Sequence, residues 1–261
     1  MLERAARKGW GVYEWCYREN LEPHGWLSEE EVDEKKGVIS AAMWQAEYEN
    51  QDPNPGARAI QTDKVELMFN RELGDVPGAE NVYYEFEEPK AEGVYATGTD
   101  WAKERDWTII WTLRVDVSPA RVVAFERTGR MDWSVMVSKH DARVLRYPKK
   151  AAHDATGVGN VINDYLTVPS EPFVFAGRER SQLLSRYITA IEHGEVESPM
   201  IDFAYSEHKF ASNEEIYTGK GHLPDSIAAG ALAWHCYKKA GVVPKKKKKK
   251  QAWVGASFNR R

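Results

Sequence analysis

The central third of the chain contains short runs of β-branched and aromatic residues, each bounded by turn-forming residues. The runs lie within residues 94–102, 107–116 and 121–129. Segments of this length and composition are typical of strands. Because the three runs follow one another directly, the pattern predicts an antiparallel meander.

Beyond residue 130, helical and strand-like segments alternate. Apolar residues at helical spacing predict helices over 133–146, 159–166, 179–193 and 226–239. Two strand-like segments, at 151–157 and 171–177, lie between the first three of these helices. Gly241 and Pro244 follow the last helix and are expected to stop it. This alternation predicts an α/β fold in which three antiparallel strands and then parallel strands form one mixed sheet, flanked by helices.

The first ninety residues favour helices over strands. Ser28 is followed by three glutamates at 29–31, and carboxylates suit the unpaired amides at the start of a helix. The pattern predicts a helix from Ser28 to about Lys36, and helical spacing predicts a second helix over 39–52. We therefore expect a helical lead-in over residues 1–90.

Charge is divided unevenly along the chain. The formal net charge is −4, and residues 238–261 contribute ten basic residues and no acidic one, which leaves −14 on residues 1–237. An acidic surface suits nucleic acid poorly unless some of its carboxylates hold cations. We expect one α/β domain over residues 91–241, followed by a flexible basic tail over 242–261.

Composition excludes several classes of protein. Hydrophobic residues make up 42% of the 261 positions and charged residues 29%, which excludes wholesale disorder and allows a sizeable core. No stretch approaches the roughly 18 consecutive apolar residues of a membrane span, so no membrane partner is expected. Cys16 and Cys236 are too few for a disulfide framework or a thiolate metal site.

Three aspartates occupy positions where ligands bind in α/β folds. Asp100 ends the first strand of the meander, Asp154 ends the first strand beyond it, and Asp225 opens the last helix. Ligands of open α/β sheets gather at the carboxyl ends of strands. For each residue alone the alternative is structural: a turn cap, an Asx-turn and a helix N-cap, respectively.

Carboxylates from separate elements suit a hard cation. Mg²⁺ prefers oxygen ligands and keeps several waters, so a few converging carboxylates can hold one or two ions. Two ions roughly 3.5–4 Å apart clamp a phosphodiester, and water then attacks it without a protein nucleophile. The three aspartates therefore suggest metal-assisted phosphodiester hydrolysis.

The segments around the three aspartates read YATGTDWAKERDWTIIWTL, AAHDATGVGNVINDYL and GHLPDSIAAGALAW. In this order they resemble the three acidic motifs in the nuclease domain of phage large terminases, which has a ribonuclease H-like fold. The family's helix and short proline-containing strand before the last motif are similar to SQLLSRYITAIEHGEVESP. The segment joining the family's ATPase to its nuclease is similar to LSEEEVDEKKGVISAAMWQAEYEN.

This resemblance implies a metal-dependent endonuclease that cuts concatemeric viral DNA during genome packaging. It assigns Asp100, Asp154 and Asp225 as catalytic and metal-binding residues, with two Mg²⁺ or Mn²⁺ ions as cofactors. Asp106 matches a further acid of the family, although a turn cap explains it equally well. His222 matches a histidine that lies near the metals in some members, although a surface histidine would look the same.

The same resemblance implies double-stranded DNA as substrate. It also implies a packaging ATPase domain, the small terminase and the portal as partners, in the host cytoplasm during virus assembly. The chain departs from a complete large terminase because it lacks the ATPase phosphate loop GxxxxGK[ST]; its one Gly-Lys pair is Gly219–Lys220. An excised nuclease half, a split gene and the remnant of a longer reading frame all fit this departure.

Basic residues on both sides of the strand that ends at Asp154 are candidates for phosphate contacts. The candidates are Lys139, Arg143, Arg146, Lys149, Lys150, Arg178 and Arg180, with Arg186 close by. A solvated charged face is the alternative interpretation.

The hexalysine at 245–250 is expected to attract DNA or, by the resemblance, to engage the portal. Trp107 and Trp111 alternate with apolar residues, so we expect them on a buried face and not as platforms for bases.

Three rival functions stay open. A junction resolvase of the ribonuclease H-like class has the same acidic geometry, and a non-catalytic packaging module would bind DNA or the portal while the acids serve only folding. His140-Asp141 and His153-Asp154 match the metal-binding dipeptide of HD-type phosphohydrolases, but that family is all-helical and AAHDATGVG is a poor helix. On a strand, His153 should also face away from the site of Asp154.

Overall fold

The computed structural model describes residues 16–36, 44–45, 48–50, 57–77, 81–101, 107–129, 131–157, 162, 164–218 and 222–239. Eight strands in this part of the chain form one mixed sheet: β1 (Phe69–Val76), β2 (Val82–Glu85), β3 (Tyr95–Asp100), β4 (Thr108–Arg114), β5 (Ala120–Thr128), β6 (Lys149–Asp154), β7 (Glu171–Phe173) and β8 (Val196–Ile201). Their order is β1-β8-β5-β4-β3-β6-β7, and β2 pairs with β5 outside this path.

The strand directions confirm the predicted mixed sheet. The strands β3, β4 and β5 pair antiparallel as a meander. Strand β6 then runs parallel to β3, β7 runs parallel to β6, and β8 runs parallel to β5. The alternation of segments predicts this arrangement, in which short turns join the antiparallel strands and helices join the parallel strands that follow.

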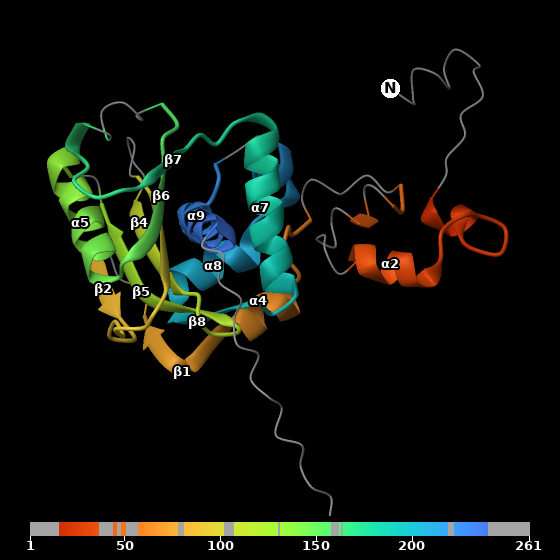
Figure 1. Ribbon diagram of the computed structural model, residues 1–261, viewed down its shortest axis with the longest axis horizontal. Helices are drawn as coiled ribbons and strands as arrows, with labels where there is room; N and C mark the ends of the chain where they lie inside the picture. The colour runs from red at the N-terminus through yellow and green to blue at the C-terminus, as the bar shows by residue number, and fades with distance from the viewer. Residues whose placement is uncertain are drawn as a thin grey trace, which may run out of the picture.

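Helices and helical turns surround the sheet. They are the 3₁₀ turn η1 (Tyr17–Asn20), α2 (Glu29–Lys36), α4 (Thr62–Met68), α5 (Trp133–Arg146), α7 (Gly177–Glu192), α8 (Asp202–Phe210), the π-helical turn η2 (Glu214–Thr218) and α9 (Asp225–Lys239). Figure 1 shows α5 on one side of the sheet and α9 with α7 on the other. None of the described helices combines the length and apolar character needed to cross a bilayer.

The largest apolar core fills the space between the sheet and the helices α7 and α9. Trp111 at the centre of β4 is fully buried there and packs edge-on against Phe125, as expected from its alternation with apolar residues. Trp107 is half-buried, with the Arg127 guanidinium 4.0 Å from its ring centroid. Both tryptophans therefore take part in packing.

The prediction of a helical lead-in over residues 1–90 did not include the two strands β1 and β2. Strand β1 pairs with β8, and only its two end residues, Phe69 and Val76, are buried. Strand β2 pairs with β5 and is half-buried along most of its length. Neither strand has a clean alternation of apolar and polar residues, so the signal on which the prediction depended is absent.

The N-terminal residues form a small apolar cluster of their own. The predicted start of α2 is confirmed: Ser28 donates its backbone N–H to Glu31 Oε2 at 2.9 Å, and the Glu31 N–H points back to Ser28 Oγ at 3.3 Å. Leu27 and Val32 pack with Trp44 in this cluster. Most of the second predicted helix, half of the helix over 159–166 and all of the basic tail lie outside the described residues.

Candidate functional site

Two of the predicted site residues end neighbouring parallel strands. Thr99 of β3 is paired with His153 of β6, so Asp100 and Asp154 are the next residues along each strand. Residues in register on adjacent strands point to the same face of the sheet. Asp154 is buried, with 3% of its surface exposed, and Asp100 is half-buried. The backbone therefore places both carboxylates at one end of the sheet and on one face.

That face is the one covered by α9. A Cβ at Gly98, two residues before Asp100, would overlap the carbonyl oxygen of Ala229 in α9. Side chains alternate along a strand, so Asp100 shares this face with Gly98. Thr99 faces the opposite way, because its Oγ1 lies 2.8 Å from His140 Nδ1 in α5. Helix α9 is therefore the element that approaches the two aspartates.

Asp225 is the first residue of α9 and lies at the same end of the sheet. Its Oδ2 accepts a hydrogen bond from the backbone N–H of Trp107 at 3.2 Å. Trp107 directly precedes β4, in which Ile109 is paired with Asp100. Asp225 is buried, with 6% exposed. Three distant segments thus bring their aspartates to one end of one face.

Two of the three carboxylates, those of Asp154 and Asp225, accept hydrogen bonds from backbone amides. Asp154 Oδ1 accepts the N–H of Thr156 at 2.7 Å, the Asx-turn given above as its structural alternative. Among the described residues, no three His, Cys, Asp or Glu side chains form a group that could hold a metal ion as they stand. A carboxylate has two oxygens and several lone pairs, so one amide bond and metal ligation are compatible. The donor set is all oxygen, which suits a hard cation, and the ligand roles stay a prediction.

The two further candidates for the metal site are Asp106 and His222. Asp106 lies outside the described residues. His222 is exposed over 61% of its side chain, and its Nε2 lies 3.8 Å from Asp225 Oδ1. That separation is longer than a hydrogen bond. His222 is therefore adjacent to the aspartates, at the solvent side of Asp225.

The histidines of the two histidine–aspartate pairs, His140 and His153, pack between α5 and the sheet. His153 is fully buried on the face opposite to Asp154, and its ring lies 6.3 Å from that of His140. Burial lowers the pKa of His140 to about 3. Asp141 Oδ2 accepts hydrogen bonds from both the N–H and the Oγ1–H of Thr167. The orientation predicted for His153 is confirmed, and the pairs differ from the all-helical HD-type arrangement.

Sequence reasoning missed an acid beside Asp225. Glu207 of α8 accepts hydrogen bonds at Oε2 from the backbone N–H of Ser226, at 2.8 Å, and from its Oγ–H, at 2.6 Å. Burial raises the pKa of Glu207 to about 7, and the Asp225 carboxylate contributes to the rise. The signal that could have found it is the apolar spacing of Ala204 and His208, which marks α8 as a helix with a buried side.

Four of the seven residues predicted to contact DNA are engaged within the fold. Lys139 pairs with Glu126 at 2.6 Å, and Arg146 donates to Glu85 at 2.6 Å. The guanidinium of Arg180 donates to the backbone carbonyls of residues 215 and 216. Arg143 is 2% exposed and pairs with Glu126 at 3.4 Å, so the prediction that it contacts phosphate was wrong because its charge is buried.

The other three are exposed but lie in different places. Lys149 and Lys150 begin β6, opposite the first residues of β3, and are therefore at the far end of the strands from Asp154. Arg178 lies in the first turn of α7. The strand before it, β7, ends with Phe173, which is paired with Asp154. Of the three exposed candidates for DNA contact, Arg178 is therefore the one at the aspartate end of the sheet.

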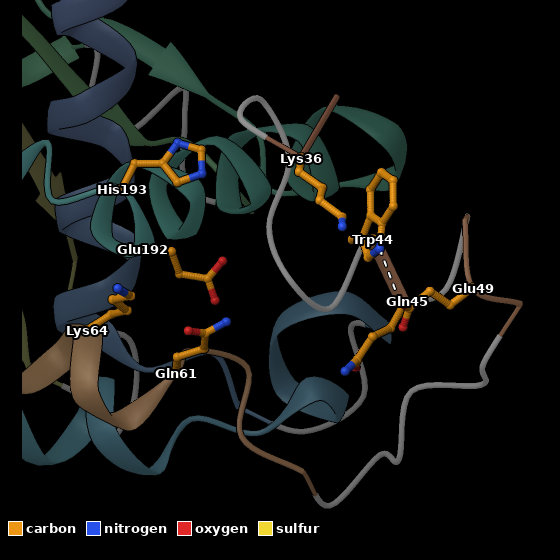
Figure 2. A pocket seen from close by; sticks show the side chains of 8 residues that line it. All are labelled: Lys36, Trp44, Gln45, Glu49, Gln61, Lys64, Glu192 and His193. Carbon is orange, nitrogen blue, oxygen red and sulfur yellow. Dashed lines mark hydrogen bonds between the residues drawn. The ribbon is translucent and has the colours of Figure 1, made fainter. Parts of the chain in front are cut away.

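A pocket elsewhere separates the N-terminal cluster from the sheet domain. Figure 2 shows Lys36, Trp44 and Glu49 on one side, facing Gln61, Lys64, Glu192 and His193 on the other. Glu192 and His193 lie at the C-terminal end of α7, whereas Arg178 lies at its start. A helix of sixteen residues is roughly 24 Å long, so this pocket is remote from the three aspartates.

No protein-family model matches the chain, and no curated protein sequence does. Solved structures do match. The large terminase nuclease from thermophilic phage G20c is 20% identical, with a TM-score of 0.54 over 67% of this chain and 96% of that chain. The large terminase nuclease domain of Thermus phage P74-26 is 18% identical, with a TM-score of 0.52 over 66% of this chain and 93% of that chain.

A longer protein matches as well. A large terminase from another thermophilic bacteriophage is 10% identical, with a TM-score of 0.54 over 89% of this chain and 56% of that chain. The G20c nuclease has also been solved with magnesium, zinc or cobalt bound. The TM-scores, at such low sequence identity, establish a shared fold, which is the ribonuclease H-like fold of large terminase nuclease domains. The resemblance drawn from the three acidic motifs is confirmed at that level.

Proposed function

We propose that this chain is a divalent-metal-dependent endodeoxyribonuclease that cuts double-stranded, concatemeric viral DNA during genome packaging. The observation that carries the proposal is the placement of Asp100, Asp154 and Asp225 at one end of one face of the sheet. The fold is one that large terminase nucleases share. The packaging ATPase, small terminase and portal are its proposed partners, in the host cytoplasm during virus assembly.

The three aspartates divide the work of holding two Mg²⁺ or Mn²⁺ ions. Asp100 and Asp154 present carboxylates from adjacent strands, and Asp225 presents a third from the start of α9. Such ions, when bound, polarise the phosphodiester and lower the pKa of a bound water. Oxygen ligands fit Mg²⁺ and Mn²⁺. Magnesium in the similar G20c nuclease supports this choice.

DNA is proposed to approach the end of the sheet where the aspartates lie. Arg178 is exposed at that end and is suited to a phosphate contact, because a guanidinium pairs with phosphate oxygens in a fixed geometry. Lys149 and Lys150 are exposed farther along β6 and would contact only DNA that extends along the sheet. His222 lies at the solvent side of Asp225, where it can orient a water or a phosphate.

The test is nicking of supercoiled plasmid. Wild-type protein should convert plasmid to open circles in Mg²⁺ or Mn²⁺, and EDTA should stop the conversion. Asp154→Asn should lower the rate at least ~10³-fold, because it removes a charged ligand and keeps the oxygen that accepts the Thr156 N–H. The melting temperature should stay within a few degrees of wild type. Asp164→Asn, at an exposed position, is the matched control and should nick normally.

Other outcomes separate the rival functions. Equal nicking by wild type and Asp154→Asn would reject the assignment of the site. No EDTA-sensitive cleavage by the wild type, together with salt-dependent DNA binding, would indicate a non-catalytic packaging module. Strong preference for a four-way junction over plasmid would indicate a junction resolvase.

A further inference from the structure

The first turn of α9 is held to α8 mainly by the Glu207 carboxylate, and Ser226 Oγ also lies 3.5 Å from His208 Nδ1. The amides at the start of a helix have no partner within the helix, and an acceptor from outside stabilises them. Here Ser226 gives both its backbone N–H and its Oγ–H to Glu207 Oε2. Ser226 is fully buried, and a carboxylate at this end of a helix also favours the helix dipole.

Glu207 itself is held on a well-anchored helix. The next residue, His208, is fully buried and donates Nδ1–H to the carbonyl of Ala204 at 2.7 Å. Its Nε2 therefore accepts the hydroxyl of Tyr187 in α7 at 3.1 Å. Glycine at position 230 lets α9 lie directly against that same hydroxyl, since a Cβ there would overlap it. Helices α7, α8 and α9 thus meet behind the first turn of α9.

Asp225 directly precedes the residue that Glu207 holds. Its own Oδ2 takes the Trp107 N–H from the opposite side, at the start of β4. Two contacts therefore help to determine the position of the Asp225 carboxylate, one through the Ser226 backbone and one to β4. Loss of the first contact would remove one of these two constraints on the helix start.

We propose that Glu207 is a positioning residue for Asp225, one that sets where this carboxylate is presented to the metal ions without ligating them. Both of the hydrogen bonds described above run to Ser226, which places the role of Glu207 at the helix start. The inference rests on the proposed metal-dependent nuclease function. It predicts a change in metal affinity, because partners that orient metal ligands are typically worth roughly 10–100-fold in affinity.

The experiment measures the Mn²⁺ concentration that gives half-maximal nicking, and separately the rise in melting temperature that Mn²⁺ causes. Glu207→Ala should raise the half-maximal concentration about 10-fold and reduce the rise in melting temperature. Glu207→Gln keeps a carbonyl oxygen for both Ser226 donors and should stay within about 3-fold of wild type. Glu66→Ala is the control, because Glu66 contacts α8 through Lys209 at 3.0 Å and is exposed.

The outcomes are distinguishable. If Glu207→Ala is less stable yet has wild-type Mn²⁺ dependence at a temperature where it is folded, Glu207 only caps the helix and the inference fails. If Glu207→Ala does not fold, Ser226→Ala, which removes the hydroxyl donor and keeps the amide, decides the matter by the same two measurements. If wild type and Asp154→Asn nick equally, the proposed function fails, whereas nicking by wild type alone leaves the result for Glu207 to be judged separately.

Discussion

Burial separates the basic side chains that hold the fold from those that are available to DNA. Arg143 has its guanidinium over the Tyr83 ring at 4.7 Å and beside Glu126, which is 3% exposed. Taking a charge out of water is costly unless it is paired, so this arginine and this glutamate depend on each other. Arg178 has no such burial and is exposed at the aspartate end of the sheet.

Substitution of Arg143 should lower stability, whereas substitution of Arg178 should weaken DNA binding. Arg143→Ala should lower the free energy of unfolding by about 1–3 kcal/mol, because Glu126 loses one of its two cationic partners and keeps Lys139 at 2.6 Å. Arg178→Ala should change it by less than about 0.5 kcal/mol. It should instead weaken DNA binding and reduce the slope of log affinity against log salt by about 1. Urea denaturation and fluorescence anisotropy at several salt concentrations measure both quantities. Normal DNA binding by Arg178→Ala would contradict its proposed phosphate contact.

The sequence predicts some of these residues and not others. Asp100, Asp154 and Asp225 could be selected because each stands at the end or start of a strongly patterned element. The role of Arg143 could not be predicted, because its partner Glu126 belongs to β5 and its aromatic neighbour belongs to β2, which the sequence does not predict. Spacing within a helix shows which residues share a side, and only the fold shows what that side meets.

Close approach of α9 to β3 is the packing feature that brings Asp225 to the strands. Gly98 allows it, since any Cβ at that position would overlap the Ala229 carbonyl. Gly98→Ala should therefore lower the free energy of unfolding by about 1–3 kcal/mol, although alanine is otherwise the better residue in a strand. Plasmid nicking should fall as well, because α9 and Asp225 move together.

A second glycine provides the control for this prediction. Gly129 follows β5, and the nearest atom to a Cβ there is 3.7 Å away, an ordinary contact. Gly129→Ala should leave both stability and nicking close to wild type. Thermal denaturation followed by circular dichroism compares the two variants. A Gly98→Ala protein as stable as wild type would show that α9 is not held against β3 as closely as the structure has it.

The sequence predicts the helices and strands that are buried over most of their length better than those with little buried surface. Strands β3, β4 and β5 and helices α5, α7 and α9 each have long apolar patterns, because each is buried against the core over most of its length. Strand β1 has two buried residues in eight, and α8 has two in nine. Elements with so little buried surface give only a weak periodic signal, and tertiary contacts determine much of their structure.

For the whole molecule, buried neutral histidines make stability depend on pH. Burial lowers the pKa of His140 to about 3 and that of His208 to about 4, well below the ordinary value of 6.5. The unfolded chain therefore binds more protons than the folded chain between about pH 4 and 6.5. Each histidine should cost about 1 kcal/mol of stability per pH unit as pH falls through that window.

The acid Glu207 has the opposite effect on how stability depends on pH. Glu207, with a pKa of about 7 against an ordinary 4.5, favours the folded state as pH falls from about 7 to 4.5. The two histidines together outweigh it, so the free energy of unfolding should still fall between pH 6.5 and 4. Urea denaturation of wild type and of His208→Gln measures the slope. His208→Gln should have the shallower slope, and an identical slope would contradict a neutral buried His208.

Three aspartates from distant segments are proposed to form one metal site at the end of the sheet. The most direct measurement is anomalous diffraction from crystals soaked in Mn²⁺. We predict density for ions bound among Asp100, Asp154 and Asp225, and its loss in Asp154→Asn crystals. Ordered Mn²⁺ at other positions, with none among these aspartates, would contradict the account.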